Sequence, residues 1–258
     1  MTIARRNYGT GHGYKLDGIK APGVTRILGM MPKDALSQWY GRTAADYAVN
    51  HWAELAKLPN MDRHKRIAGA ANEERDTAAR KGTAVHRYAE PLARGQRIDW
   101  GAVPDELAGH VRSYAAWLRR FDVDPVAIEL LVANRLVGYC GTADLVAHLL
   151  GQVWLLELKT ARSGIYRESA LQACAYSRAE TYGAVGEAEE HPLSGLGIER
   201  CGSVWIRSDG CDLRALDTGE EVWAYFCRLA ANFAAEDDSR EWVGELIDPP
   251  APREELTA

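Results

Sequence analysis

The sequence lacks the features that mark several classes of protein. Within its 258 residues, no apolar run approaches the roughly eighteen residues that a membrane-spanning helix requires. Its first residues include no apolar segment of the kind found in secretory signals, so we expect a cytoplasmic protein without membrane contact. Also missing are G-x-x-x-x-G-K-[ST] loops, H-E-x-x-H pairs and G-x-S-x-G elbows, which argues against a fused helicase motor, a zinc metalloprotease and a serine hydrolase.

Cysteine and lysine are both scarce. The five cysteines are odd in number, none precedes Cys140, and no two have C-x-x-C spacing. This pattern is typical of reduced thiols and argues against a disulfide framework or a zinc finger. Only seven of the 31 basic residues are lysine, so 24 are arginine, a bias that suits a GC-rich genome.

What is present fits a globular chain. Hydrophobic residues make up 47% of the sequence and charged residues 26%, which are ordinary values for one large domain or two small ones. A chain of this length can bury a substantial core without disulfides. The formal net charge of −5 argues, taken alone, against a nucleic-acid partner.

That net charge is unevenly distributed along the chain. Residues 62–97 hold nine basic and five acidic side chains, whereas residues 217–258 hold three basic and eleven acidic ones. The basic stretch is either a solvated helix face or the wall of a groove that binds a DNA backbone, and both interpretations stay open. In the second interpretation, Arg80, Lys81 and Arg87 contact the DNA.

Hydrophobic periodicity divides the chain into a helical N-terminal part and a mixed region. The Gly-rich first 30 residues predict short strands and turns. The patterns predict helices at 34–56, 62–80, 82–94, from Pro104 onward, 169–182 and 220–235, and strands at 127–137, 139–150, 152–161 and in a hairpin around Asp209-Gly210. We therefore expect one α/β domain over residues 1–258, with a mainly helical part at 1–80, a core at 81–237 and an acidic tail at 238–258.

Aromatic residues recur along the first long helix. Trp39, Tyr47 and Trp52 follow its periodicity, which predicts that they belong to its core face. The alternative is that they form platforms on which single-stranded bases stack.

The most informative stretch joins two predicted strands. If these strands pair across a turn at Leu150-Gly151, the numbers of facing residues sum to 301, which places Asp144 opposite Glu157. Lys159 then projects from the same face as Glu157. Two carboxylates side by side in an apolar sheet repel each other, and a divalent cation with oxygen ligands would remove that cost. The alternative is a solvated strand face with Asp144 at the end of a turn.

Two weaker patterns flank this stretch. His86 and Glu90 lie four residues apart on a predicted helix, as do Gln172 and Tyr176 on the helix after the Glu157 strand, so each pair shares a helix face. Gln172 and Tyr176 could hydrogen-bond a phosphate or a base edge. Each pair taken alone is more typical of ordinary surface or partly buried side chains.

Taken together and in order, the motifs G-x-x-H…E, G-x-x-D, E-x-K and Q-x-x-x-Y resemble those of the PD-(D/E)XK nuclease superfamily, in its RecB-type and phage exonuclease branch. They span residues 82–176, about a third of the chain. The resemblance implies a restriction-endonuclease-like core, with a small mixed central sheet flanked by helices. It also implies a Mg²⁺- or Mn²⁺-dependent DNA exonuclease that serves phage or mobile-element recombination and repair in a bacterial host cell.

The resemblance also implies a role for each motif residue. Asp144 and Glu157 would be the main metal ligands, helped by the backbone carbonyl of Leu158. His86 would be an additional ligand or a phosphate contact. Lys159 would be the catalytic lysine, while Gln172 and Tyr176 would orient the DNA and the active site. Glu90 and Glu129 are possible additional acids. DNA, as single strands or duplex ends, would be the substrate, and a single-strand annealing or recombination protein is a candidate partner.

Two departures and two alternatives accompany this resemblance. The related CRISPR-associated four-cysteine nucleases hold an iron–sulfur cluster, but their early cysteine and late C-x-x-C are absent here, so we expect no cluster. A structure-specific or sequence-tolerant endonuclease would use the same chemistry on another substrate geometry. A non-catalytic DNA-binding adaptor could keep the fold, although the complete D…E-x-K pattern argues against it.

Overall fold

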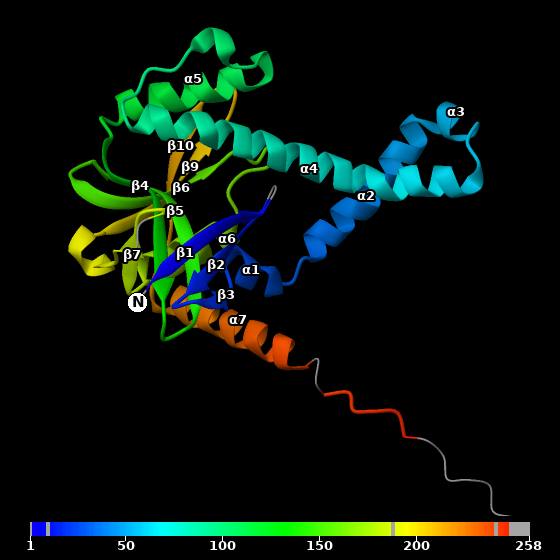
Figure 1. The fold of residues 1–258 in the computed structure, drawn as a ribbon. Coiled ribbons are helices and arrows are strands. Elements are labelled where there is room, and N and C mark those ends of the chain that lie inside the picture. The colour runs from blue at the N-terminus through cyan, green and yellow to red at the C-terminus, as the bar shows by residue number, and fades with distance from the viewer. Residues whose placement is uncertain (1, 9–10, 187–188, 240–241, 248–258) are drawn as a thin grey trace, which may run out of the picture.

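The computed structural model describes residues 2–8, 11–186, 189–239 and 242–247, and these form a mixed α/β fold (Figure 1). Its centre is a seven-stranded sheet in the order β10-β9-β6-β5-β4-β7-β8. Strands β6 and β9 are parallel, whereas the other neighbours are antiparallel. The strands are β4 (Asp124–Asn134), β5 (Tyr139–Leu149), β6 (Gln152–Lys159), β7 (Thr181–Gly183), β8 (His191–Pro192), β9 (Arg200–Ile206) and β10 (Cys211–Ala215). The expected central mixed sheet flanked by helices is confirmed.

Helices cover both faces of this sheet (Figure 1). On one face, α5 (Asp105–Arg120) and the C-terminal part of α4 (Asn60–Ala93) bury apolar side chains such as Val111 and Val85 against Leu145 and Leu156. The other face is covered by α1 (Val24–Ile27), α6 (Arg167–Ser177) and α7 (Glu220–Asp238), which pack around the fully buried Phe226. The sheet is therefore buried from both sides, and any charged side chain within it must have a compensating partner.

A small antiparallel sheet precedes the central one. It contains β1 (Ile3–Tyr8), β2 (Gly11–Leu16) and β3 (Ile19–Ala21), in that order. Ile3 and Tyr14 pack with Leu131 and Cys140 of the central sheet. Because side chains alternate along a strand, Arg5 points to the same side as Ile3, toward the central sheet.

A helical arm projects from this body (Figure 1). We use that name for α2 (Asp34–Asn50), α3 (Trp52–Leu55) and the N-terminal half of α4. The two helices expected at 62–80 and 82–94 are one continuous helix, so the expected boundary after residue 80 falls inside α4. Gly82 lies within this helix without interrupting it. A β-carbon there would lie 3.1 Å from Thr160 Oγ1, just after β6, so the glycine permits a close approach of α4 to this residue.

The aromatic residues of the arm are not core residues. Helix α2 has no buried residue, Trp39 and Tyr47 are half-buried, and Trp52 is 52% exposed. The core prediction is therefore wrong. The physical reason is that α2 packs mainly against one neighbour, α4. Only part of its apolar stripe is therefore covered, and the edges of the stripe stay in solvent.

The remaining elements follow the sequence closely. The three central strands and the β9–β10 hairpin around Asp209-Gly210 are confirmed. The helix expected over 169–182 is α6, which ends at Ser177, because the following residues form β7 and pair with β4. None of the described helices is long and apolar enough to cross a membrane. Most of the expected acidic tail, residues 248–258, lies outside the described residues.

Candidate metal centre

The β5–β6 hairpin has the register that the sequence predicts. Its pairs run from Leu149↔Gln152 to Leu145↔Leu156, and each pair sums to 301. Leu150 and Gly151 form the turn with positive φ values of 54° and 75°. Beyond the Leu145 pair the ladder ends, and the backbone N–H of Leu158 donates instead to Asp144 Oδ2 at 2.7 Å. Asp144 is thereby held against the strand that carries Glu157.

Glu157 is the most unusual charged residue of the sheet. Its side chain is 6% exposed, and its Oε1 accepts hydrogen bonds from Lys159 Nζ at 2.9 Å and Gln172 Nε2 at 2.6 Å. Its other oxygen, Oε2, is buried and has no hydrogen-bond partner among the described residues. A buried carboxylate oxygen without a donor is costly, so this atom fits a ligand that a cation would satisfy.

A second group of ligand atoms gathers around Asp144. His86, Glu129 and Asp144 each offer one ligand atom, and the three atoms lie within 4.8 Å of one another. His86 Nδ1 lies 3.4 Å from Asp144 Oδ1. Two carboxylates and one imidazole form a donor set that accommodates Mg²⁺ or Mn²⁺. The residues present therefore fit a divalent metal.

Glu129 reaches this group through an irregular backbone. The neighbouring pairs, Ile128↔Leu145 and Leu130↔Ala143, place it opposite Asp144, but Glu129 itself is unpaired and has a φ of 54°. This left-handed conformation costs a non-glycine residue about 1–3 kcal/mol, and such outliers cluster at functional sites. The sequence alone left open which way Glu129 faces, and the structure places it with Asp144 and His86.

Burial and mutual repulsion shift the pKa values of these groups. Burial raises the pKa of Glu157 to about 7, and the charge of Asp144 adds to this rise while Lys159 opposes it. Burial also works to raise the pKa of Asp144, but His86 outweighs it and holds that pKa below its usual range. Burial would lower the pKa of His86, but the Asp144 carboxylate raises it to about 9. Glu157 and His86 therefore hold their protons more tightly than usual, and a divalent cation bound by these groups would compete with those protons.

Gln172 and Tyr176 belong to the same network. Gln172 is 6% exposed, its Oε1 accepts from Lys159 Nζ at 2.9 Å, and its Nε2 lies 3.0 Å from Tyr176 Oη. The ring of Tyr176 lies directly over Gly141, where any β-carbon would overlap it. The G-x-x-D and Q-x-x-x-Y motifs are thus joined by packing, and Gln172 is not the surface residue that its pattern alone suggests.

Several other expected residues lie outside this network. Glu90 forms an exposed ion pair with Arg94 at 3.0 Å and is not part of the group that could share an ion with His86 among the described residues. Arg80 and Arg87 are exposed on α4 and Lys81 is half-buried there, so all three remain predicted DNA contacts.

Sequence reasoning missed Arg5, whose Nη1 donates to Glu129 Oε2 at 3.0 Å. The available signal was a charged residue on the apolar side of a strand, two positions after Ile3.

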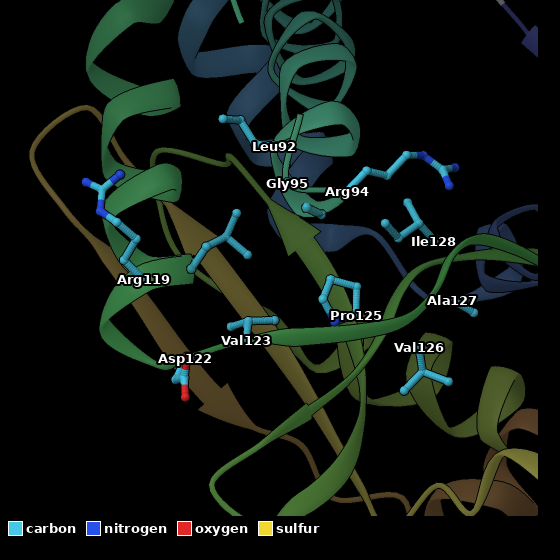
Figure 2. A pocket seen from close by; sticks show the side chains of 12 residues that line it. Leu92, Arg94, Gly95, Arg119, Asp122, Val123, Pro125, Val126, Ala127 and Ile128 are labelled. Carbon is cyan, nitrogen blue, oxygen red and sulfur yellow. The ribbon is translucent and has the colours of Figure 1, made fainter. Parts of the chain in front are cut away.

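Two grooves lie beside the centre along β4. The larger, of about 680 Å³, is lined by the C-terminal ends of α4 and α5 and by the start of β4, including Val123, Pro125 and Ile128 (Figure 2). The smaller, of about 270 Å³, shares Ile128 with it and reaches Glu129. The smaller groove therefore has one of the candidate ligands in its lining.

Comparisons with known proteins add little to this geometry. No protein family and no curated protein matches the sequence. Among solved structures, the chain is similar to an alkaline exonuclease from Laribacter hongkongensis, at 15% identity over 63% of this chain and 81% of that one, with a TM-score of 0.35. It is also similar to the protein SSO0001, at 16% identity over 60% of this chain and 74% of that one, with a TM-score of 0.29. Overlaps this weak say nothing about activity, which has to be inferred from the side chains.

Proposed function

We propose that this chain is a metal-dependent deoxyribonuclease of the PD-(D/E)XK type that removes nucleotides from DNA ends. The observation that carries the proposal is the buried, unpartnered Oε2 of Glu157. His86, Glu129 and Asp144 offer ligand atoms within 4.8 Å of one another, and the charge of Asp144 also acts on Glu157. Lys159 and Gln172 donate to the other oxygen of Glu157. The contacts among Glu157, Lys159 and Gln172 join residues of the E-x-K and Q-x-x-x-Y motifs.

In this proposal Asp144, Glu157, His86 and the carbonyl of Leu158 hold Mg²⁺ or Mn²⁺. When bound, such an ion lowers the pKa of a coordinated water and stabilises negative charge on the scissile phosphate. Glu129 is a further candidate ligand, and Glu90 forms an ion pair with Arg94.

Lys159 is the proposed catalytic lysine. Its ammonium group has three N–H donors, and two acceptors, Glu157 Oε1 and Gln172 Oε1, lie 2.9 Å from Nζ. The side chain is 29% exposed, so the third donor can reach an attacking water or a phosphate oxygen. Gln172 accepts from this lysine and donates to Tyr176. Both residues are buried, so together they hold the lysine in place.

Helix α4 is the proposed path of the DNA backbone. The residues from Asn60 to His86 span about 39 Å at the usual rise of about 1.5 Å per residue, so the helix leads from the arm to the centre. Arg80, Lys81 and Arg87 lie within a few residues of His86 and would neutralise phosphates there. The exonucleolytic mode, the role in phage or mobile-element recombination and repair, a cytoplasmic location in a bacterial host cell and an annealing or recombination partner rest on the motif resemblance.

The decisive experiment digests end-labelled single-stranded and duplex linear DNA, with covalently closed circles in parallel. Each is incubated with Mn²⁺, with Mg²⁺ or with a chelator. We expect metal-dependent release of nucleotides from linear DNA and resistance of the circles. Glu157→Gln serves as the matched inactive variant, because it keeps the shape of the side chain.

The other outcomes discriminate between the alternatives. Cleavage of closed circles would establish an endonuclease of the same fold. Retained DNA binding with no cleavage under any metal condition would favour the non-catalytic adaptor and overturn the proposal.

A further inference from the structure

Arg5 lies at the metal centre although it comes from the separate N-terminal sheet. Its side chain is 20% exposed, and its Nη1 donates to Glu129 Oε2 at 3.0 Å and lies 3.5 Å from Thr142 Oγ1. Thr142 Oγ1 also lies 2.9 Å from Tyr14 Oη on β2. The small sheet therefore reaches the centre through the guanidinium group of Arg5, whose partners lie on β4 and β5.

The location of Arg5 follows from packing. Ile3, on the same side of β1, is buried against Leu131 and Cys140, so β1 is fixed on the central sheet two residues before Arg5. The guanidinium has little freedom to leave, and its Nε is buried without a hydrogen-bond partner among the described residues. Burying an arginine in this way is costly, and its ion pair with Glu129 is the compensation that the structure offers.

Two features of Glu129 make its ion pair with Arg5 important for its position. Its backbone is left-handed and is not held by a ladder pair with Asp144. Its carboxylate also lies beside the Asp144 carboxylate, which repels it. Without a bond to Arg5, the least costly response is for the Glu129 side chain to swing away from Asp144 and His86.

We propose that Arg5 is a positioning residue of the metal centre, which holds the Glu129 carboxylate beside Asp144 and His86 so that all three can bind one divalent cation. Arg5 occupies one carboxylate oxygen, and a carboxylate has a second oxygen that can accept the ion. This inference rests on the proposed metal centre. It concerns Arg5 and Glu129, which lie outside the E-x-K motif formed by Glu157 and Lys159.

Charge and position predict opposite results when Arg5 is removed. A positive charge near a cation site repels the cation, so if only the charge mattered, Arg5→Gln would tighten metal binding. If Arg5 positions Glu129, the same change weakens binding, and groups that orient ligands typically change metal affinity about 10- to 100-fold. The sign of the change therefore identifies the role.

The experiment measures Mn²⁺ binding by calorimetry and by electron paramagnetic resonance, without DNA. We expect Arg5→Gln to raise the Mn²⁺ dissociation constant by about tenfold or more. Arg6→Gln is the matched control, because it removes the same charge from the next residue of β1, whose side chain is exposed. It should bind Mn²⁺ as the wild type does.

A double-mutant cycle with Glu129→Gln tests the route of the effect. If Arg5 acts through Glu129, the double variant binds Mn²⁺ no more weakly than Glu129→Gln alone. Arg5→Lys provides a second variant should Arg5→Gln fail to fold, since it keeps the charge but not the planar guanidinium, and it should also weaken binding.

The failures of the two proposals are distinguishable. Unchanged or tighter Mn²⁺ binding by folded Arg5→Gln or Arg5→Lys, or a Glu129→Gln variant that binds as the wild type does, would overturn the role of Arg5 and leave the metal centre standing. A wild-type protein that binds no Mn²⁺ would overturn the metal centre itself.

Discussion

Two carboxylates lie buried in the sheet body, whereas an ion pair in the helical arm lies exposed to solvent. In the body, the side chains of Glu157 and Asp144 are 6% and 11% exposed. In the arm, the Arg75–Asp76 ion pair has side-chain exposures of 52% and 50%. A solvated pair costs and contributes little, whereas buried carboxylates are retained against a large desolvation cost. The candidate metal centre is therefore marked by buried charge and not by the local balance of charge along the chain.

The largest expected effect separates these two regions by activity. Asp144→Asn or Lys159→Ala should lower Mn²⁺-dependent DNA cleavage by roughly a thousandfold or more, since a metal centre contributes several kcal/mol to transition-state charge stabilisation. Glu54→Gln, at an exposed position of the arm, should leave cleavage unchanged. Release of label from linear DNA measures all three. Equal losses in the body and the arm would remove the distinction between them.

Two glycines, one in the sheet body and one in the arm, should respond oppositely to substitution by alanine. Gly141→Ala places a methyl group against the edge of the buried Tyr176 ring, where it overlaps ring atoms, and should destabilise the fold by about 1–3 kcal/mol. Gly41→Ala, in an exposed turn of α2 with no atom nearby, should stabilise it by about 0.5–1 kcal/mol, because alanine favours helices. Urea denaturation measures both changes. Shifts of the same sign would show that the packing of Tyr176 over Gly141 is not as close as described.

Two features of the sheet show how far the sequence could predict the structure. The 301 register of β5 and β6 was predictable, because a two-residue turn with a glycine fixes the pairing of the strands that it joins. The packing of Tyr176 on Gly141 was not, since the two residues belong to elements whose relative placement depends on the whole core. The position of Arg5 on the apolar side of its strand was visible in the sequence, but its contact with Glu129 was not, because only the docking of the small sheet brings the two together.

The arm was mispredicted for a related reason. Periodicity identifies an apolar face on α2, but it does not say how much of the protein covers that face. The pattern was therefore correct about the helix and wrong about the burial of Trp39, Tyr47 and Trp52.

The pH dependence of stability provides a smaller test of the body. The pKa of Glu157 is raised from 4.5 to about 7 and that of His86 from 6.5 to about 9, so both groups bind protons more tightly in the folded state. The stability that each contributes is present below its unfolded pKa and is lost as pH rises through its folded pKa. The thermal midpoint of the metal-free protein should therefore fall as pH rises from about 6 to about 9.

One variant and one ligand test whether these two groups cause the fall of the thermal midpoint. His86→Gln should remove the part of the fall near pH 9, and saturating Mn²⁺ should raise the midpoint most at the alkaline end, where the ligands are already deprotonated. A midpoint that rises over this range in the metal-free protein would contradict the pKa shifts.

The smallest expected effect belongs to the arm. Asp76→Asn removes the carboxylate that accepts two hydrogen bonds from Arg75, but both side chains are solvated and the pair is screened. Urea denaturation should give the wild-type midpoint within error. A clear loss of stability would mean that the arm depends on its surface charges more than its exposure indicates.

Mn²⁺ binding followed by electron paramagnetic resonance tests most directly whether the buried carboxylates form a metal centre. The wild type should bind Mn²⁺ saturably, and Asp144→Asn and Glu157→Gln should each weaken that binding by about a hundredfold or more while the proteins stay folded. If folded Glu157→Gln binds Mn²⁺ as tightly as the wild type does, the unpartnered Oε2 of Glu157 is not a metal ligand and the assignment of this centre is contradicted.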